Sequence, residues 1–136
     1  MYEDNAYKTV LILNKGAELW RVMNAAIHSA MGLQHQLSSE ITMLDYSTAD
    51  QQKASVGKYP VILCRAKNHG ALLRAMKEAE ELNIKPNYFL NEMIGESAAS
   101  QQKSVSEIDL ACGNLIAVSL FGESSDLEEI TKRLSL

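Results

Sequence analysis

The chain has 136 residues, a hydrophobic fraction of 46% and a formal net charge of −4. This length and composition predict one globular domain over residues 1–136, whose core needs neither a disulfide nor a structural metal. The thirteen Lys and Arg residues are scattered along the sequence, so nucleic-acid binding is not expected from the charge. No segment has the length and apolar character of a membrane span, and the N-terminus lacks a signal-peptide pattern. We therefore expect no membrane association and a cytoplasmic location.

The cysteines and histidines indicate no metal site. Cys64 lies in the apolar run PVILCRA, and Cys112 precedes Gly113 without a histidine nearby in the sequence. There is no CxxC pair, and the three histidines are not spaced as metal ligands. We therefore expect no metal and no cofactor.

The first third of the chain predicts a strand, a turn and an amphipathic helix. The continuous apolar run at 9–13 is typical of a central strand covered on both faces. Residues 17–31 predict a helix, and Gly32 is placed to end it. The helical spacing predicts that one set of apolar side chains packs on the sheet: Leu19, Val22, Met23, Ala26 and Ala30.

The rest of the chain alternates between strand and helix patterns. Further strands are predicted at 40–46, 59–66, 87–94 and 114–121. Residues 70–83 predict a second helix, and the capping-box pattern of Ser125 and Glu128 predicts a third. The polar segments 47–58 and 95–106 are predicted as loops. This order favours a three-layer α/β/α sandwich with a mixed, mostly parallel sheet of about four strands.

Three polar residues of the first predicted helix form a candidate site. Arg21, Asn24 and His28 are spaced at i, i+3 and i+7, so they share one stripe of the helix. An arginine and an amide can hold a carboxylate or phosphate, and a histidine can transfer protons near neutral pH. The solvated face of an amphipathic helix has the same spacing, and the spacing alone favours that interpretation.

Residues at the predicted carboxyl edge of the sheet extend the candidate site. Lys15 lies between a buried strand and a helix, where backbone amides favour anions, although one glycine does not make a phosphate motif. Asn91 and Glu92 follow a predicted strand and can present an amide and a carboxylate at the same edge. The predicted ligand-binding residues are Lys15, Arg21, Asn24, His28 and Asn91.

Three blocks of sequence resemble the type II peptidyl-tRNA hydrolase fold: KTVLILN with WRVMNAAIHSAMG, YPVILCRA with the helix after it, and LIAVSLFGES with ITKRLSL. Within that fold the chain is most similar to an uncharacterised bacterial branch, domain of unknown function 2000. The resemblance implies the hydrolase-like α/β fold and a homodimer. Arg21 falls at the hydrolase lysine and His28 matches its histidine, whereas Ala25 stands where the hydrolase has glutamine. The Asp-Ala-Gly motif is absent, and Gly113-Asn114-Leu115-Ile116 replaces Gly-Thr-x-Thr.

Two functions follow, and they remain alternatives. The first is a small-ligand or partner-binding protein without the hydrolase catalytic set. The alternative is a hydrolase of a peptidyl-tRNA-like or other ester, with His28 as general base, Arg21 holding the anion and Glu92 orienting the base. That alternative predicts that His28 and Glu92 share a hydrogen bond or a bridging water. A pure interaction module would instead expose an apolar patch. The candidates for that patch are Trp20, Met23 and Met31.

Overall fold

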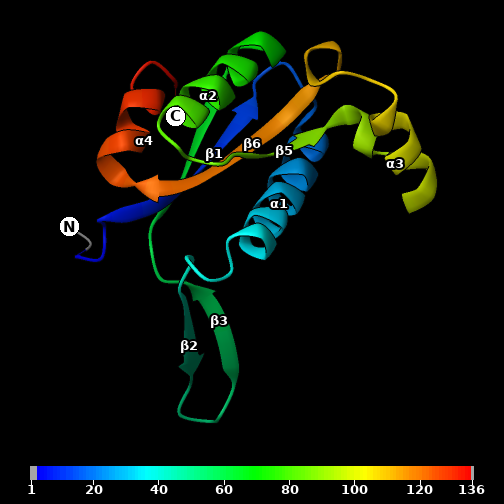
Figure 1. Ribbon diagram of the computed structural model, residues 1–136. Coiled ribbons are helices and arrows are strands. Elements are labelled where there is room, and N and C mark those ends of the chain that lie inside the picture. Colours follow the sequence, from blue (N-terminus) through cyan, green and yellow to red (C-terminus); the bar gives the residue numbers. More distant parts are fainter. Residues whose placement is uncertain (1–2, 136) are drawn as a thin grey trace.

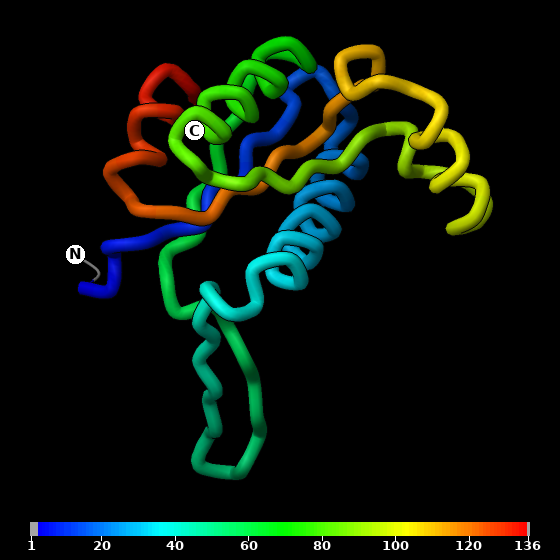
Figure 2. Tube along the Cα trace, in the orientation of Figure 1, coloured from blue at the N-terminus to red at the C-terminus, as the bar shows by residue number. Residues whose placement is uncertain are grey.

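The computed structural model describes residues 3–135. Figure 1 shows a body built on a sheet, with one hairpin and one helix projecting from it, and Figure 2 traces the chain out along each projection and back. The strands are β1 (Tyr7–Asn14), β2 (Met43–Ser47), β3 (Lys53–Gly57), β4 (Val61–Ala66), β5 (Asn87–Leu90) and β6 (Leu115–Glu123). The helices are α1 (Leu19–Gln36), α2 (His69–Glu81), α3 (Ala98–Ser106) and α4 (Ser124–Thr131), with 3-10 turns η1 (Asn91–Met93) and η2 (Leu110–Cys112).

The main sheet has four strands in the order β4-β1-β6-β5. The prediction of a mixed sheet of about four strands is confirmed, but the expectation that it is mostly parallel is wrong. Only β1 and β4 pair in parallel, while β6 runs antiparallel to both of its neighbours. The reason is that β6 begins at the edge where β1 ends. There the Asn14 side-chain amide donates to the Leu115 carbonyl at 2.8 Å.

The two faces of this sheet carry separate hydrophobic clusters. Val10 and Ile12 of β1 are fully buried in the larger cluster with side chains of α2 and α4, such as Leu72 and Leu127. The smaller cluster lies beneath α1 and includes Ala25. Coverage on both faces explains the unbroken apolar run of β1, as the sequence predicts.

Helix α1 packs on the sheet through a stripe that only partly matches the predicted one: Val22 packs against the smaller cluster, but the centre of the contact lies elsewhere. Its buried residues are Ala25, Ser29 and Leu33, whereas Leu19 and Met23 are 74% and 58% exposed. The Ser29 hydroxyl bonds the Ser119 hydroxyl of β6 at 2.7 Å inside this contact. Small side chains let α1 approach the strand closely, so hydrophobicity alone selected the wrong face.

Gly32 does not end α1, which continues to Gln36. A Cβ atom on Gly32 would lie 2.5 Å from the Asn87 side-chain nitrogen, which itself donates to the Ser29 carbonyl at 2.8 Å. The glycine therefore allows β5 to approach α1, and the expectation that it stops the helix is wrong.

Strands β2 and β3 form a two-stranded hairpin that includes much of the predicted loop at 47–58. Tyr46 and the Leu44–Val56 pair lie on one face, while Asp45 accepts a hydrogen bond from Ser55 at 2.6 Å on the other. This alternation with a period of two is the strand signal that the polar composition concealed. No residue of either strand is buried.

Helix α3 replaces the second predicted loop, at 95–106. The Ser97 hydroxyl accepts from the Ser100 amide at 3.1 Å, which caps the helix. No residue of α3 is buried, because its sequence offers small and polar side chains rather than an apolar stripe. The remaining predicted strands and helices agree with the structure to within a few residues.

Candidate functional site

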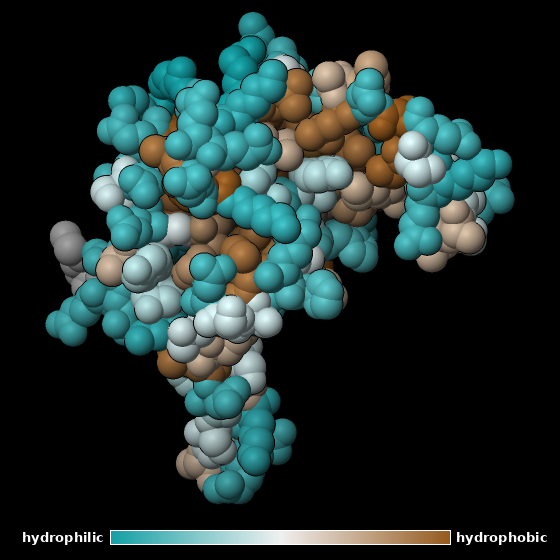
Figure 3. Space-filling model, viewed as in Figure 1, coloured by the Kyte–Doolittle hydropathy of each residue, from teal (hydrophilic) through white to brown (hydrophobic). Residues whose placement is uncertain are grey.

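A cavity of about 600 Å³ opens between α1 and the projecting helix α3. We call it the α1–α3 groove. On the face shown in Figure 3, apolar residues gather where α3 leaves the body. The residues that line the groove are Asn24, His28, Phe89, Met93, Ile94, Gln101, Gln102, Val105 and Ser106.

His28 and Asn24 contribute the polar edge of α1 to this groove. The imidazole of His28 stacks on the Phe89 ring, with centroids 5.6 Å apart and planes inclined by 16°. Within residues 3–135, neither the His28 ring nor the Asn24 amide makes a hydrogen bond to the protein. Their donors and acceptors are therefore available to a molecule in the groove.

The floor and far wall of the groove combine apolar and amide side chains. Phe89 and Met93 supply the apolar floor, and the Leu90 amide donates to the Met93 sulfur at 3.5 Å, which fixes the turn after β5. Gln101 and Gln102 of α3 add two amides to the wall. An apolar cavity with a few convergent polar groups is the usual form of a small-molecule site.

Arg21 lies at the carboxyl edge of the sheet, outside the groove lining. Its guanidinium donates to the Asn91 side-chain oxygen at 2.7 Å and lies 3.9 Å from a Glu18 carboxylate oxygen. It also stands 4.5 Å above the centre of the Trp20 ring. The structure therefore brings Arg21 and Asn91 together, as the sequence suggests. The two side chains bind each other, however, and neither lines the groove.

Glu92 holds the loop that leads into β6. One of its carboxylate oxygens accepts from the Asn114 amide at 2.8 Å. Gly113 fits beside it because a Cβ there would lie 3.3 Å from that oxygen and 3.0 Å from a methyl of Leu90. Glu92 and His28 form no hydrogen bond with each other, and Glu92 does not line the groove.

Lys15 is separated from the other predicted ligand-binding residues. It lines a second cavity, of about 660 Å³, beside β4 and α2. The structure therefore brings Asn24 and His28 together and places Lys15 in a different site. The groove residues that the sequence reasoning missed include Phe89 and the α3 side chains. The Ser97 cap is the sequence signal that could have indicated α3, and it gives no information about Phe89.

The cysteines and the other side chains that could bind a metal form no metal site within residues 3–135. Burial raises the pKa of the Cys64 thiol from 9.0 to about 11, although nearby Lys8 lowers it in part. Such a thiol is protonated at neutral pH and is a poor nucleophile. In the described part of the chain, no three His, Cys, Asp or Glu residues gather as metal ligands. Nor does any helix there have the length and hydropathy of a membrane span.

Comparison with known proteins identifies the family. The sequence profile described as protein of unknown function (DUF2000) matches residues 7–136. The chain belongs to the DUF2000 family. A similar solved structure is the protein of unknown function Atu0240 from Agrobacterium tumefaciens strain C58. Its TM-score is 0.80 with 19% identity, over 96% of this chain and 97% of that one. At this identity the likeness shows a shared fold alone, and no curated protein matches the sequence.

Membership of DUF2000 confirms the family branch that the three sequence blocks suggested. The broader resemblance to type II peptidyl-tRNA hydrolases remains a prediction.

Proposed function

We propose that this DUF2000 protein binds a small organic molecule in the α1–α3 groove. The single observation that carries the proposal is the pairing of an apolar floor with His28 and Asn24, which have no hydrogen-bonding partner within residues 3–135. The floor favours an apolar or aromatic body, and the polar edge favours a substituent that can exchange hydrogen bonds with an imidazole or an amide.

The conformation of α3 supports this function. The helix has nine residues, none of them buried, and it contacts the body mainly through the turn η1. A helix this short depends on its cap and on tertiary packing, so α3 is a wall of low local stability. A ligand that contacts Gln101, Gln102 and Val105 adds the packing that the free helix lacks, so binding should stabilise α3.

The experiment is a fragment screen by thermal shift with aromatic and aliphatic acids, amides and alcohols, followed by calorimetry of each hit. Gln102→Ala should weaken the hits severalfold and His28→Ala by about tenfold, because each removes a polar contact. Lys103→Ala is the matched control, since Lys103 is next to Gln102 in α3 but does not line the groove. Hits that respond equally to all three variants would contradict the proposal.

The alternative function is a hydrolase of a peptidyl-tRNA-like or other ester, with His28, Arg21 and Glu92 as its residues. The geometry favours it less, because Arg21 is engaged by Asn91, and a Glu92 oxygen by the Asn114 amide. We expect purified protein to release no peptide from a peptidyl-tRNA substrate above the buffer rate. Turnover that disappears in Arg21→Ala would establish the alternative instead.

We further propose that the body is the three-layer α/β/α fold of type II peptidyl-tRNA hydrolases. The support is the placement of α1 over one face of the sheet and of α2 and α4 over the other. A solved hydrolase structure that superposes on β1, α1, β4 and β6 in the same order would support this assignment, and a different strand order would contradict it.

A homodimer is the third proposal, and the apolar outer stripe of α1 favours it. Met23, Ile27 and Met31 are 58%, 60% and 64% exposed, and Val61 and Leu63 of β4 are 56% and 53% exposed. Val61 and Leu63 lie on the α1 side of the sheet, because the alternating residues of β4 pack in the opposite cluster.

The area of these surfaces fits a second copy of the chain. With Trp20 and the apolar face of the hairpin, they expose on the order of 1,000 Å², taking about half of each large side chain. A standard interface covers about 800 Å² per partner, so this apolar area is large enough for one. A lone two-stranded hairpin is only marginally stable in water, so a partner that covers it would stabilise it.

Sedimentation velocity tests the homodimer. The wild type should sediment as a dimer at micromolar concentration, and Met23→Glu with Ile27→Glu should sediment as a monomer of unchanged helix content. Lys77→Glu on the exposed face of α2 is the control. A wild type that remains monomeric at 100 times that concentration would contradict the proposal.

A further inference from the structure

The second cavity collects positive charge in a chain with a net charge of −4. We call it the basic pocket. It is lined by five of the thirteen Lys and Arg residues, together with one carboxylate, Glu78. The cationic lining residues are Lys15, Arg65, Lys67, Arg74 and Arg133. These residues are scattered along the sequence, but the fold brings them together at one cavity.

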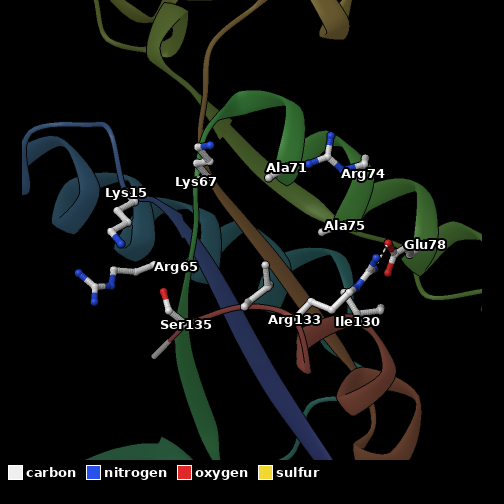
Figure 4. A pocket seen from close by; sticks show the side chains of 11 residues that line it. Lys15, Arg65, Lys67, Ala71, Arg74, Ala75, Glu78, Ile130, Arg133 and Ser135 are labelled. Atoms are coloured by element: carbon white, nitrogen blue, oxygen red, sulfur yellow. Dashed lines mark hydrogen bonds and ion pairs between the residues drawn. The ribbon is translucent and has the colours of Figure 1, made fainter.

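The one carboxylate in the lining is already neutralised. Figure 4 shows Glu78 of α2 in a hydrogen-bonded ion pair with Arg133, which follows α4. Within residues 3–135, the side chains of Lys15, Lys67 and Arg74 make no hydrogen bond or ion pair. Gathering like charges without counter-ions raises the free energy of the folded chain, and a bound anion offsets that cost.

The backbone around the basic pocket also favours an anion. Lys15 follows β1 and Lys67 follows β4, the parallel pair of the sheet, and ligands of open α/β sheets bind at the carboxyl ends of such strands. The pocket runs along α2 from its first turn, the positive end of the helix dipole. Ala71 and Ala75 line it one helical turn apart, and their small side chains leave the space open (Figure 4).

We propose that the basic pocket binds a small molecule through a phosphate group. The Arg74 guanidinium can donate hydrogen bonds to two phosphate oxygens, while Lys15 and Lys67 act as mobile point charges. The dianionic charge of a phosphate matches several cations better than a single carboxylate does. A cavity of about 660 Å³ holds a phosphorylated metabolite rather than a polymer.

An extended nucleic acid fits this surface less well. Outside the pocket the chain has sixteen carboxylates against eight Lys and Arg residues. The carboxylates include Glu80 and Glu81 of α2 and Glu128 and Glu129 of α4. A phosphate backbone that left the pocket would meet these like charges within a few residues of helix. The site is independent of the α1–α3 groove and does not rest on the function proposed there.

The test is a titration of ¹⁵N-labelled full-length protein with inorganic pyrophosphate, followed by amide chemical shifts. Saturable shifts should concentrate at the amides of 67–75 and around Lys15. The double variant Lys67→Gln/Arg74→Gln should weaken binding at least about tenfold, because each cation contributes a charge-assisted hydrogen bond. Lys77→Gln is the control, since Lys77 is an exposed cation of α2 outside the pocket.

Both substituted side chains are exposed and two like charges are removed, so the unfolding midpoint should equal or exceed that of the wild type, and a loss of binding will not reflect unfolding. Three results would overturn the proposal. They are the absence of saturation at millimolar pyrophosphate, an equal loss in the Lys77→Gln control, and shifts that concentrate in the α1–α3 groove. Tight, salt-sensitive binding of a 20-nucleotide RNA without binding of pyrophosphate would also overturn it and indicate a polyanion surface.

Discussion

The α1–α3 groove takes its floor from Phe89 and Met93 and its polar edge from Asn24 and His28, whereas the basic pocket takes five cations from four separate segments. The two cavities are nearly equal in volume, about 600 and 660 Å³. The groove can discriminate by shape and hydrogen bonding, and the pocket by charge. Because the linings differ while the volumes do not, the two cavities should bind different kinds of ligand. Substitutions in one cavity should leave binding in the other unchanged.

The largest effect should come from the packing of α1 on the cluster that includes Phe89, part of the groove floor. Ala25 stands where the hydrolase resemblance calls for glutamine, and it is fully buried in the cluster with Phe89, Ile116 and Ala117. Ala25→Gln should destabilise the fold by about 3 kcal/mol, because it overpacks the contact and buries an amide without a partner. Chemical denaturation measures the change.

His35→Gln provides the control for Ala25→Gln. His35 is exposed on the same helix, so its substitution should change the free energy of unfolding by less than about 0.5 kcal/mol. Equal stability of the two variants would show that Ala25 is not tightly packed against the sheet. Pyrophosphate binding should survive in any folded fraction of Ala25→Gln.

Reversal of charge should break the basic pocket alone. Lys67→Glu with Arg74→Glu should reduce pyrophosphate affinity roughly hundredfold, because two attractive contacts become repulsive. Calorimetry of the same variant with a groove-binding fragment should show unchanged affinity. Loss of both affinities would mean that ligand binding in the two cavities is coupled rather than independent.

The sequence predicts the body of the fold better than the cavities. The buried runs of β1, β4 and β6 are continuous, so their pattern identifies them. The groove depends on α3, whose small polar residues give no periodic signal, and the basic pocket depends on residues as distant as Lys15 and Arg133. Arg21 and His28 were correctly placed on one helix, but hydrophobicity could not predict that Ala25 and Ser29 form its contact face.

Alkaline pH should lower the free energy of unfolding through Cys64 of β4. Burial holds the pKa of Cys64 in β4 at about 11 in the folded protein, against 9.0 for an ordinary thiol. Between these values the unfolded chain loses a proton that the folded chain keeps. The free energy of unfolding should therefore fall by up to about 1.4 kcal/mol per pH unit across that window.

Cys64→Ala isolates this effect. The variant loses the titrating thiol and retains the other groups that titrate at alkaline pH, so the difference between the two unfolding curves should shrink from pH 9 to pH 11. A constant difference across that range would show that Cys64 titrates normally in the folded protein. Cys112, which is exposed, should react with thiol reagents before Cys64 at pH 8.

Salt should produce the smallest difference between the cavities. Raising the ionic strength from 0.05 to 0.5 M should weaken pyrophosphate binding about threefold or more, because the cations of the pocket are solvent-accessible. Binding of an uncharged fragment in the groove should be unchanged or slightly stronger. The same salt response at both sites would indicate that they share one ligand chemistry.

Ligand binding in the α1–α3 groove can be mapped by amide chemical shifts of the uniformly ¹⁵N-labelled protein, titrated with an uncharged aromatic amide found in the fragment screen. We expect saturable shifts centred on His28, Phe89 and residues 101–106, with none at 67–75. Shifts centred on the basic pocket, or no saturable shift with any fragment, would contradict this expectation.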